Sequence, residues 1–468
     1  MNPQAFATLD AAAITGCVRD GSASAREVAQ CALARVDMLN ARYNAFTAIT
    51  RERALSDADA IDALRARGAR LPPLAGVPFA VKNLFDVAGL TTLAGAAIEA
   101  TRPAAAADAT VVARLHAAGA VLVGALNMEE YAYGFVSENA HYGAVRNPHD
   151  VTCVAGGSSG GSAAALAAGM LPLTLGSDTS GSIRVPAALC GVYGLKPTYG
   201  RLPRSGAYPF AGSLDHVGPL ARSVTDLATA YDAMQGPDAR DAACAQRAVE
   251  PAAPALDDGL GALRIAVADG YFADNAGDAA LGALAVAASA LGVIRRVSLP
   301  AIDEVRAAGI IITASEGAEL HLADLRARAG DFDPATRDRF LAGALVAVAW
   351  YLRAQRFRAW FRTQMHDVFG GVDVILAPAT PVPATPLGAT TFELRGRHHP
   401  PRTHLGLLAH AFSFAGVPVV AVPIGGTAMP LGVQVIAAPW REDHALRVAR
   451  TLERAGVASA HVAAGALR

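Results

Sequence analysis

The fold of this chain is decided by two neighbouring stretches, Cys153-Val154-Ala155-Gly156-Gly157-Ser158-Ser159-Gly160-Gly161-Ser162 and Asp178-Thr179-Ser180-Gly181-Ser182-Ile183-Arg184-Val185-Pro186. Each is a turn of small, hydroxyl-bearing residues, and the sequence between them predicts a short helix and an apolar strand. Glycine has no Cβ, so such turns let backbone N–H groups and serine oxygens approach a ligand closely. Two of them together, followed by Arg-x-Pro and preceded by a lysine in an apolar strand, indicate a catalytic centre.

The overall composition limits what the protein can be. Of its 468 residues, 53% are hydrophobic and 17% charged, so we expect a large buried core and not a disordered chain. The formal net charge is −1, which gives no reason to expect a nucleic acid or an acidic lipid surface as a direct partner.

The cysteines and the apolar runs bear on where the protein works. The five cysteines are irregularly spaced and form no CxxC pair, which argues against a disulfide framework and against a zinc site: Cys17, Cys31, Cys153, Cys190 and Cys244. Residues 1–20 lack the basic start and apolar run of a signal peptide. Other apolar runs are shorter than the ~20 residues of a membrane span. We therefore expect a cytoplasmic protein without a membrane partner.

Outward from the centre, the sequence predicts alternating helices and strands. Upstream we expect two helices around a short extended piece over 24–67, a strand over 77–87, a helix over 108–118, a strand over 120–126 and a helix from Met128. Ser24, with Glu27 three residues on, is the expected N-cap of the first helix. Downstream we expect helices over 223–234, 279–291, 336–366 and 442–455, and strands over 263–267, 293–299, 372–376, 417–422 and 431–437.

This alternation favours an α/β architecture. Residues 236–262 are rich in Ala, Pro and Asp without a clear period, and predict a surface connection. Because alternation resumes after them, we expect one large domain over 1–468, with a catalytic core at about 72–225.

Two common uses of a glycine-rich turn fit poorly. Gly157-Ser158-Ser159-Gly160-Gly161 matches the G-x-S-x-G elbow of α/β-hydrolases, but Asn147–Ala155 is a poor candidate for the strand that must precede it. The histidines that could complete a Ser-His-Asp triad have no distinctive context: His216, His321, His366, His404 and His410. No G-K-[ST] follows the glycines, so a phosphate-binding loop is also disfavoured.

A lysine base fits the sequence better. A serine hydroxyl is a weak nucleophile and needs an adjacent base. A neutral lysine can serve if burial lowers its pKa by roughly 3 units from ~10.4. Lys82 lies in the apolar run Pro78-Phe79-Ala80-Val81-Lys82-Asn83-Leu84-Phe85, where burial is expected, although a lysine at a strand end can also reach solvent.

Taken together, Lys82 and the two serine turns resemble the amidase signature family of serine hydrolases. The match continues through Gly194–Thr198, Leu214–Pro219 and Pro430–Gln434. The resemblance implies a single large domain in which a mixed central sheet is covered by helices on both faces. Many members of the family have glycine where this chain has Ser180, a change that keeps the backbone N–H.

The resemblance also implies roles for individual residues. Ser182 would be the acylated nucleophile, Ser158 a bridging serine held by a cis peptide bond, and Lys82 the ultimate base. Backbone N–H groups would form the oxyanion hole at Thr179, Ser180, Gly181 and Ser182. Ser159, Asp178 and Arg184 would support them. Neither a metal nor an organic cofactor is implied.

Within the family, the similarity is greatest to an enzyme that releases ammonia from a small linear, carboxylated urea derivative. That relative implies a small helical partner protein, and hence a dimer or a heterotetramer. Oxalurate-like acids of purine breakdown remain an alternative substrate class. Two other hypotheses remain: the glutamine-hydrolysing subunit of a tRNA amidotransferase, and a catalytically inactive binding protein.

A carboxylated substrate needs a cation or several N–H donors in its pocket. The candidates by sequence are Arg204, Arg353 and Arg356, with Asn127, Tyr131 and Tyr133 as further pocket liners. For Arg353 and Arg356, which share a predicted helix with other arginines, a solvated face is the simpler interpretation. For Tyr131 and Tyr133 it is core packing.

Overall fold

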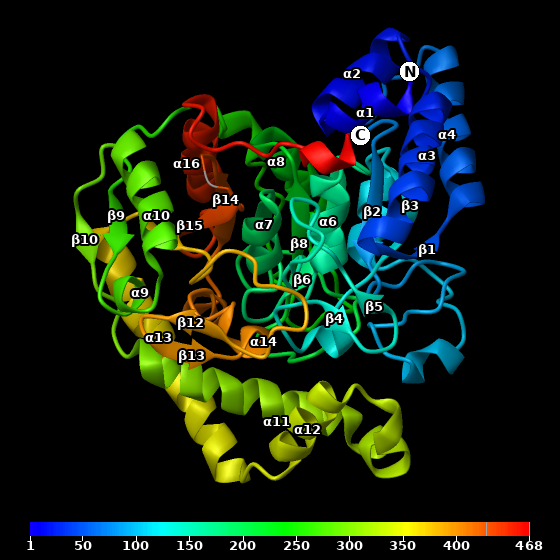
Figure 1. The fold of residues 1–468 in the computed structure, drawn as a ribbon. Helices are drawn as coiled ribbons and strands as arrows, with labels where there is room; N and C mark the ends of the chain where they lie inside the picture. The colour runs from blue at the N-terminus through cyan, green and yellow to red at the C-terminus, as the bar shows by residue number, and fades with distance from the viewer. Residues whose placement is uncertain (427, 468) are drawn as a thin grey trace.

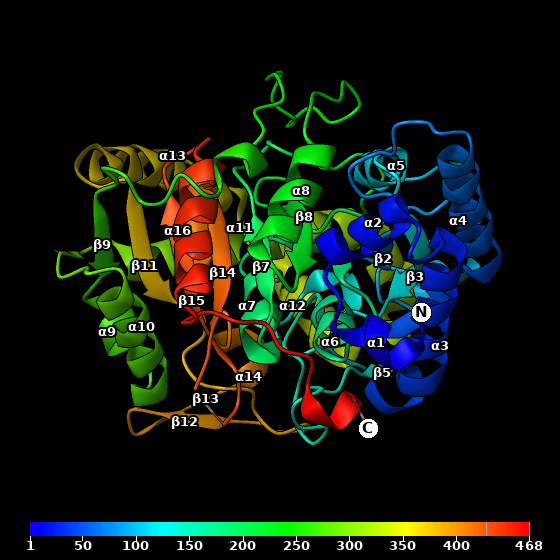
Figure 2. The same ribbon diagram turned by 90° about the horizontal axis from the view of Figure 1, so that it is seen from above.

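The computed structural model describes residues 1–426 and 428–467, and its centre is an 11-stranded mixed sheet. In spatial order the strands are β1 (Phe46–Ile49), β3 (Val121–Leu126), β2 (Pro78–Lys82), β6 (Leu173–Asp178), β8 (His216–Ala221), β7 (Tyr193–Lys196), β14 (Val419–Ile424), β15 (Leu431–Ala437), β11 (Val374–Pro378), β9 (Ile265–Ala268) and β10 (Arg296–Val297). Figure 2 shows β9, β11, β15, β14, β7, β8, β2 and β3 following one another across the molecule.

Strand direction places the two halves of the candidate site at one edge. β2 pairs in parallel with both β3 and β6. The register aligns Val81 with Leu175, so Lys82 at the end of β2 lies beside the last residues of β6. Because the carboxyl ends of parallel strands meet at the same edge of a sheet, side chains that follow both strands converge there.

Helices cover both faces of the sheet, as predicted. On one face lie α6 (Gly160–Ala167), α7 (Arg184–Cys190) and α10 (Asp278–Ala290), and on the other α8 (Val224–Met234) and α16 (Glu442–Arg454). Next to β3 lie α3 (Ala25–Tyr43) and α4 (Arg51–Ala66), the two helices expected over 24–67. Ser24 caps α3 in a capping box with Glu27. The α/β prediction is confirmed.

Three helices form an arm at one end of the molecule: α11 (Ile302–Arg328), α12 (Pro334–Ala344) and α13 (Val348–Gly371). Figure 1 shows α11 and α12 at the lower end, outside the sheet layers. The prediction of a single helix over 336–366 was wrong, because α12 ends at Ala344 and a separate helix, α13, begins at Val348. α11 was not predicted, and its interior Gly309 and Gly317 lower local helix propensity.

Two other predictions were wrong in detail. The helix expected from Met128 is only a short 3₁₀ turn, Glu130–Ala132, in which Tyr131 and Ala132 have φ of 48° and 59°. The strand expected over 293–299 shrinks to β10. Residues 236–262 contain one short 3₁₀ turn, Ala253–Ala255.

The remaining elements are short and complete the layers. They are α1 (Pro3–Thr8), α2 (Ala11–Asp20), α5 (Thr110–Ala117), α9 (Tyr271–Asp274), α14 (Pro401–His404), α15 (His410–Ala415), the pairs β4 (Glu138–Asn139) with β5 (Gly143–Ala144) and β12 (Phe392–Leu394) with β13 (Arg397–His399), and 3₁₀ turns at Ile98–Thr101, Ala329–Asp331 and Ala464–Ala466. Among the described residues, no helix has both the length and the apolar character needed to cross a membrane.

Candidate active site

The site is built around the amine of Lys82, which is fully buried at the end of β2. Its Nζ donates hydrogen bonds to Ser158 Oγ at 2.6 Å and to Ser177 Oγ at 2.9 Å. Ser158 follows a cis peptide bond with Gly157, as the family resemblance implied. Lysine and bridging serine are therefore in direct contact, although they are distant in sequence.

Burial sets the protonation of this amine. Loss of hydration lowers the pKa of Lys82 to about 7, against the opposing influence of the Asp178, Asp215 and Glu129 carboxylates, which raise it. An amine with this pKa is largely neutral just above pH 7 and can accept a proton.

The second serine turn is held against the first. Ser159 N–H donates to the carbonyl of Ser182 at 3.2 Å, and Ser159 Oγ bonds the carbonyl and the N–H of Ser177 at 3.2 and 3.3 Å. Asn127 carbonyl accepts from Gly161 N–H at 3.0 Å. These bonds fix both turns to the edge of β6, so the hydroxyls of Ser158 and Ser182 belong to one rigid unit.

Asp178 and Arg184 form a fully buried ion pair under Ser182. Arg184 Nε and Nη2 donate to the two carboxylate oxygens, each at 2.9 Å. Burial raises the pKa of the Asp178 carboxyl, but Arg184 more than offsets this and holds it well below its usual range. Arg184 also donates to Gln434 Oε1 at 2.7 Å and so ties the turn to β15.

The backbone donors of the turn divide into two groups. Gly181 N–H donates to Asp178 Oδ1 at 2.7 Å, so the carboxylate already occupies it. Within residues 1–426 and 428–467, the N–H groups of Thr179, Ser180 and Ser182 have no protein acceptor. Of the four donors that the resemblance implied, these three remain available to a ligand.

A cavity of about 240 Å³ opens at Ser182. Its wall combines the second serine turn with the helical arm, through Arg306 and Ile310 of α11 and Arg339 of α12, and with His410 of α15. No aspartate or glutamate is among its lining residues. Burial lowers the pKa of His410 to about 4, so its imidazole is neutral at pH 7.

The two arginines of this cavity lack carboxylate partners in the described chain. Arg339 stacks on the Tyr133 ring, 3.3 Å from its centroid, and donates to the Tyr133 carbonyl at 2.6 Å. Arg306 Nη2 lies 2.9 Å from His404 Nε2. Two cations without carboxylate partners beside Ser182 make this cavity suited to an anionic ligand.

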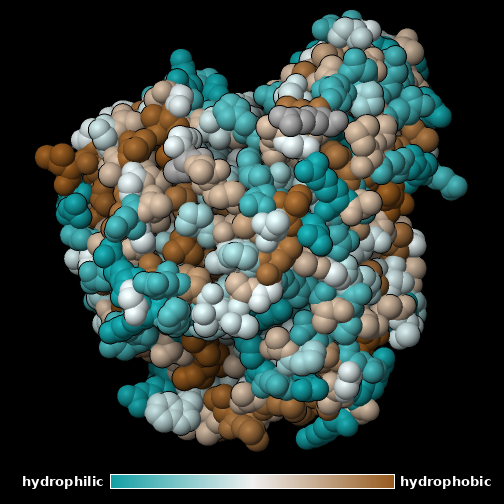
Figure 3. Space-filling view, viewed as in Figure 1, coloured by the Kyte–Doolittle hydropathy of each residue, from teal (hydrophilic) through white to brown (hydrophobic). Residues whose placement is uncertain are grey.

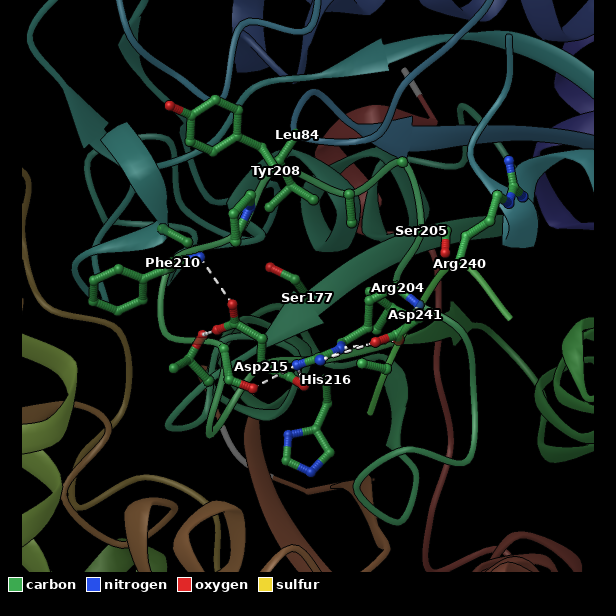
Figure 4. Close-up of a pocket in the computed structure, with 18 residues that line it drawn as sticks. Leu84, Ser177, Arg204, Ser205, Tyr208, Phe210, Asp215, His216, Arg240 and Asp241 are labelled. Atoms are coloured by element: carbon green, nitrogen blue, oxygen red, sulfur yellow. Dashed lines mark hydrogen bonds and ion pairs between the residues drawn. The ribbon is translucent and has the colours of Figure 1, made fainter. Parts of the chain in front are cut away.

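A second cavity of about 280 Å³ adjoins the first and shares Ala132, Thr179 and Phe210 with it. Ser177, Asp215 and Arg204 line it, and Figure 4 shows Arg204 paired with Asp241. Arg204 Nη2 lies 3.1 Å from Asp241 Oδ1, and Nη1 donates to the Gly212 carbonyl at 2.7 Å. Arg204 is thus occupied by the protein itself and lies outside the cavity at Ser182.

Of the six candidate substrate-binding residues, only Tyr133 lines the cavity at Ser182. Asn127 is buried and donates to the carbonyls of Asn44 and Gly143 at 3.2 and 3.1 Å. Tyr131 is buried, and its hydroxyl donates to Glu99 at 3.0 Å. Arg353 and Arg356 are exposed on α13. Sequence reasoning missed Arg306 and Arg339, which carry no motif and reach the site only through packing of the arm, and it named His410 only as a histidine without a distinctive context.

Comparison with known proteins agrees with this geometry. The Amidase family pattern matches residues 27–446. The chain is 56% identical over 444 residues to AtzE, a component of the 1-carboxybiuret hydrolase of Pseudomonas sp. (strain ADP), covering 94% of this chain and 97% of that protein. It is 38% identical over 468 residues to a glutamyl-tRNA(Gln) amidotransferase component of Chromohalobacter salexigens, covering 94% of each.

Solved structures give the same result. A structure described as a vestigial protein complex that reveals the evolutionary origins of an s-triazine catabolic enzyme superposes with a TM-score of 0.96 at 55% identity, covering 96% of this chain and 99% of the other. A glutamyl-tRNA(Gln) amidotransferase component of Thermotoga maritima superposes with a TM-score of 0.80 at 28% identity, covering 96% and 95%. The chain therefore belongs to the amidase signature family and is an amidase, a hydrolase of amide C–N bonds.

Proposed function

We propose that this amidase hydrolyses the terminal amide of a small linear, carboxylated urea such as 1-carboxybiuret and releases ammonia. The observation that carries the proposal is the small cavity at Ser182, which is lined by two arginines without carboxylate partners. The 56% identity to a 1-carboxybiuret hydrolase component supports it independently.

The proposed reaction begins with proton transfer through two hydroxyls. Neutral Lys82 takes the proton of Ser158, which takes that of Ser182, and Ser182 Oγ attacks the amide carbonyl. The free N–H groups of Thr179, Ser180 and Ser182 would hold the developing oxyanion, each contributing about 10²-fold or more to kcat. As the C–N bond breaks, the proton returns through Ser158 to the leaving nitrogen, and ammonia departs.

Water then completes the cycle. It attacks the acyl-Ser182 carbonyl while Lys82, through Ser158, accepts its proton. When the second tetrahedral species collapses, the proton returns to Ser182 and the product leaves, which for a urea substrate is a carbamic acid. Every proton in this sequence moves between Lys82, the two serines, water and the substrate.

Recognition of the substrate is assigned to the arm. The guanidinium of Arg339 stacks on the Tyr133 ring. Its remaining N–H donors and those of Arg306 can donate hydrogen bonds to a carboxylate. Glutamine fits less well, because its ammonium group would find no acidic side chain in this wall. An oxalurate-like acid presents the same carboxylate and terminal amide, and remains a competing substrate.

The assembly and the compartment are also proposed. One solved relative comes from a protein complex, and we infer that this chain likewise works in an assembly of several chains, with a small helical partner in a dimer or heterotetramer. The unpaired cysteines fit a reducing compartment such as the cytoplasm.

Ammonia release from a matched set of amides tests the substrate. Freshly prepared 1-carboxybiuret, oxalurate, glutamine and biuret would be offered to the purified chain, with Ser182→Ala as the blank. Biuret is the neutral control, because it lacks only the carboxylate. We expect kcat/KM to be about 100-fold higher for 1-carboxybiuret than for biuret or glutamine. A preference for glutamine would overturn the proposal, and a preference for oxalurate would reassign the acid.

A further inference from the structure

Ser177 is a hydroxyl in contact with the catalytic amine, and neither serine turn contains it. It lies in β6, one residue before Asp178, and its Oγ accepts a hydrogen bond from Lys82 Nζ at 2.9 Å. It also lines the second cavity, whereas Ser182 lines the first. Figure 4 shows the Ser177 side chain in the middle of that second cavity.

The direction of the lone pair on Lys82 decides whether it can act. A neutral amine has two N–H donors and one lone pair, and a lysine side chain is free to rotate about its terminal bond. Proton transfer requires the lone pair to point at the Ser158 hydroxyl. A fixed acceptor that takes one of the N–H groups limits this rotation.

Ser177 is fixed in the way that such an acceptor needs to be. Its N–H and carbonyl are bonded to Ser159 Oγ, so its backbone cannot shift without moving the glycine turn. Its own hydroxyl hydrogen can be donated to water in the second cavity, which leaves the oxygen free to accept from Lys82. Ser159 therefore holds the backbone of Ser177 in place, and the hydroxyl of Ser177 stays available to the amine.

We propose that Ser177 is a positioning residue: it accepts one N–H of Lys82 and so directs the lone pair of that amine to Ser158. The proposal rests on the proposed function, because it assigns Lys82 the role of base. Three carboxylates also act on the amine, namely Asp178 of β6, Asp215 before β8 and Glu129 after β3. They stay unchanged in the variants below, so any change of pH profile is due to the hydroxyl.

The test compares Ser177→Ala with Ser177→Thr, which keeps the hydroxyl. The matched control is Thr174→Val, which removes another buried hydroxyl of the same strand, one that donates to the Ser162 carbonyl at 3.1 Å and does not contact Lys82. For Ser177→Ala we expect kcat to fall roughly 10- to 100-fold with KM within about twofold of the wild-type value. The acid limb of its pH profile should move to lower pH, because the hydroxyl favours the ammonium form.

The rate at which a fluorophosphonate labels Ser182 gives a second readout that needs no substrate. It should fall in parallel with kcat in Ser177→Ala, return with Ser177→Thr, and stay at the wild-type rate in Thr174→Val. If the wild type is labelled and Ser177→Ala is labelled equally fast with an unchanged acid limb, the inference is wrong and the proposed function stands. If the wild type is not labelled at all, both the inference about Ser177 and the proposed function are wrong.

Discussion

The two sides of Ser182 are built in opposite ways. On the sheet side, Lys82, Ser158, Asp178 and Arg184 are fully buried, and each has its partners within the protein. On the arm side, Arg339 and Arg306 face a cavity without a carboxylate. Figure 3 shows apolar side chains at the lower end of the molecule, where the arm lies. The difference teaches that the sheet satisfies its buried polar groups within the protein, whereas the arm presents two guanidinium groups to a cavity without a carboxylate.

The largest effect should come from removing Lys82, the proposed general base on the sheet side. Lys82→Met replaces the amine with a neutral chain of similar length, so the protein should stay folded while kcat falls about 10³- to 10⁴-fold. Steady-state ammonia release measures the loss, and thermal melting checks the fold. A variant that keeps more than about a tenth of wild-type kcat would remove Lys82 from the mechanism.

The next effect concerns stability. Asp178→Asn leaves the guanidinium of Arg184 buried without its counter-ion, so the free energy of unfolding should fall by about 3–5 kcal/mol. Urea denaturation followed by circular dichroism measures it. Arg353→Gln, which changes an exposed arginine of the arm, serves as the control and should shift the value by less than about 0.5 kcal/mol. Equal shifts in the two variants would contradict the buried pair.

A change on the arm side should affect kcat/KM only for substrates that carry a negative charge. Arg339→Gln should lower kcat/KM for a carboxylated urea about 100-fold, because the carboxylate loses a charge-assisted hydrogen bond, and should leave biuret nearly unaffected. The comparison of the two substrates in one variant separates recognition from folding. Arg356→Gln, also an arginine of the arm but exposed, should change neither value. Equal losses on both substrates would move Arg339 out of carboxylate binding.

The smallest predicted effect is a gradual change of kcat/KM with pH. Only the neutral form of Lys82 can take a proton, and its pKa is lowered to about 7. The value of kcat/KM should therefore be level above this pH and fall about tenfold per pH unit below it. Initial rates across the acid range measure the limb. If the acid limb of the profile lay near pH ~10, Lys82 would have the pKa of an exposed lysine. Its amine would then not be buried from water.

Local sequence predicted most of the sheet and both serine turns. Continuous apolar runs mark β3, β14 and β15, and Ser24 with Glu27 marks the start of α3, because these features depend on neighbours in the chain. The helical arm was predicted poorly for the opposite reason. Gly343 leaves room for the carbonyl of Ala314, so α12 packs closely on α11, and no local pattern reports that contact.

By itself, the sequence determined the chemistry of this protein: a lysine at the end of an apolar strand and two glycine-rich serine turns, which specify the family and its reaction. Only the tertiary structure decided which arginines line the cavity at Ser182. Arg339, Arg353 and Arg356 all lie on helices of the arm and look alike in sequence, yet Arg339 alone of the three lines the cavity at Ser182. The physical reason is that the face a helix turns toward a site is set by the elements packed against it, and those are distant in the chain.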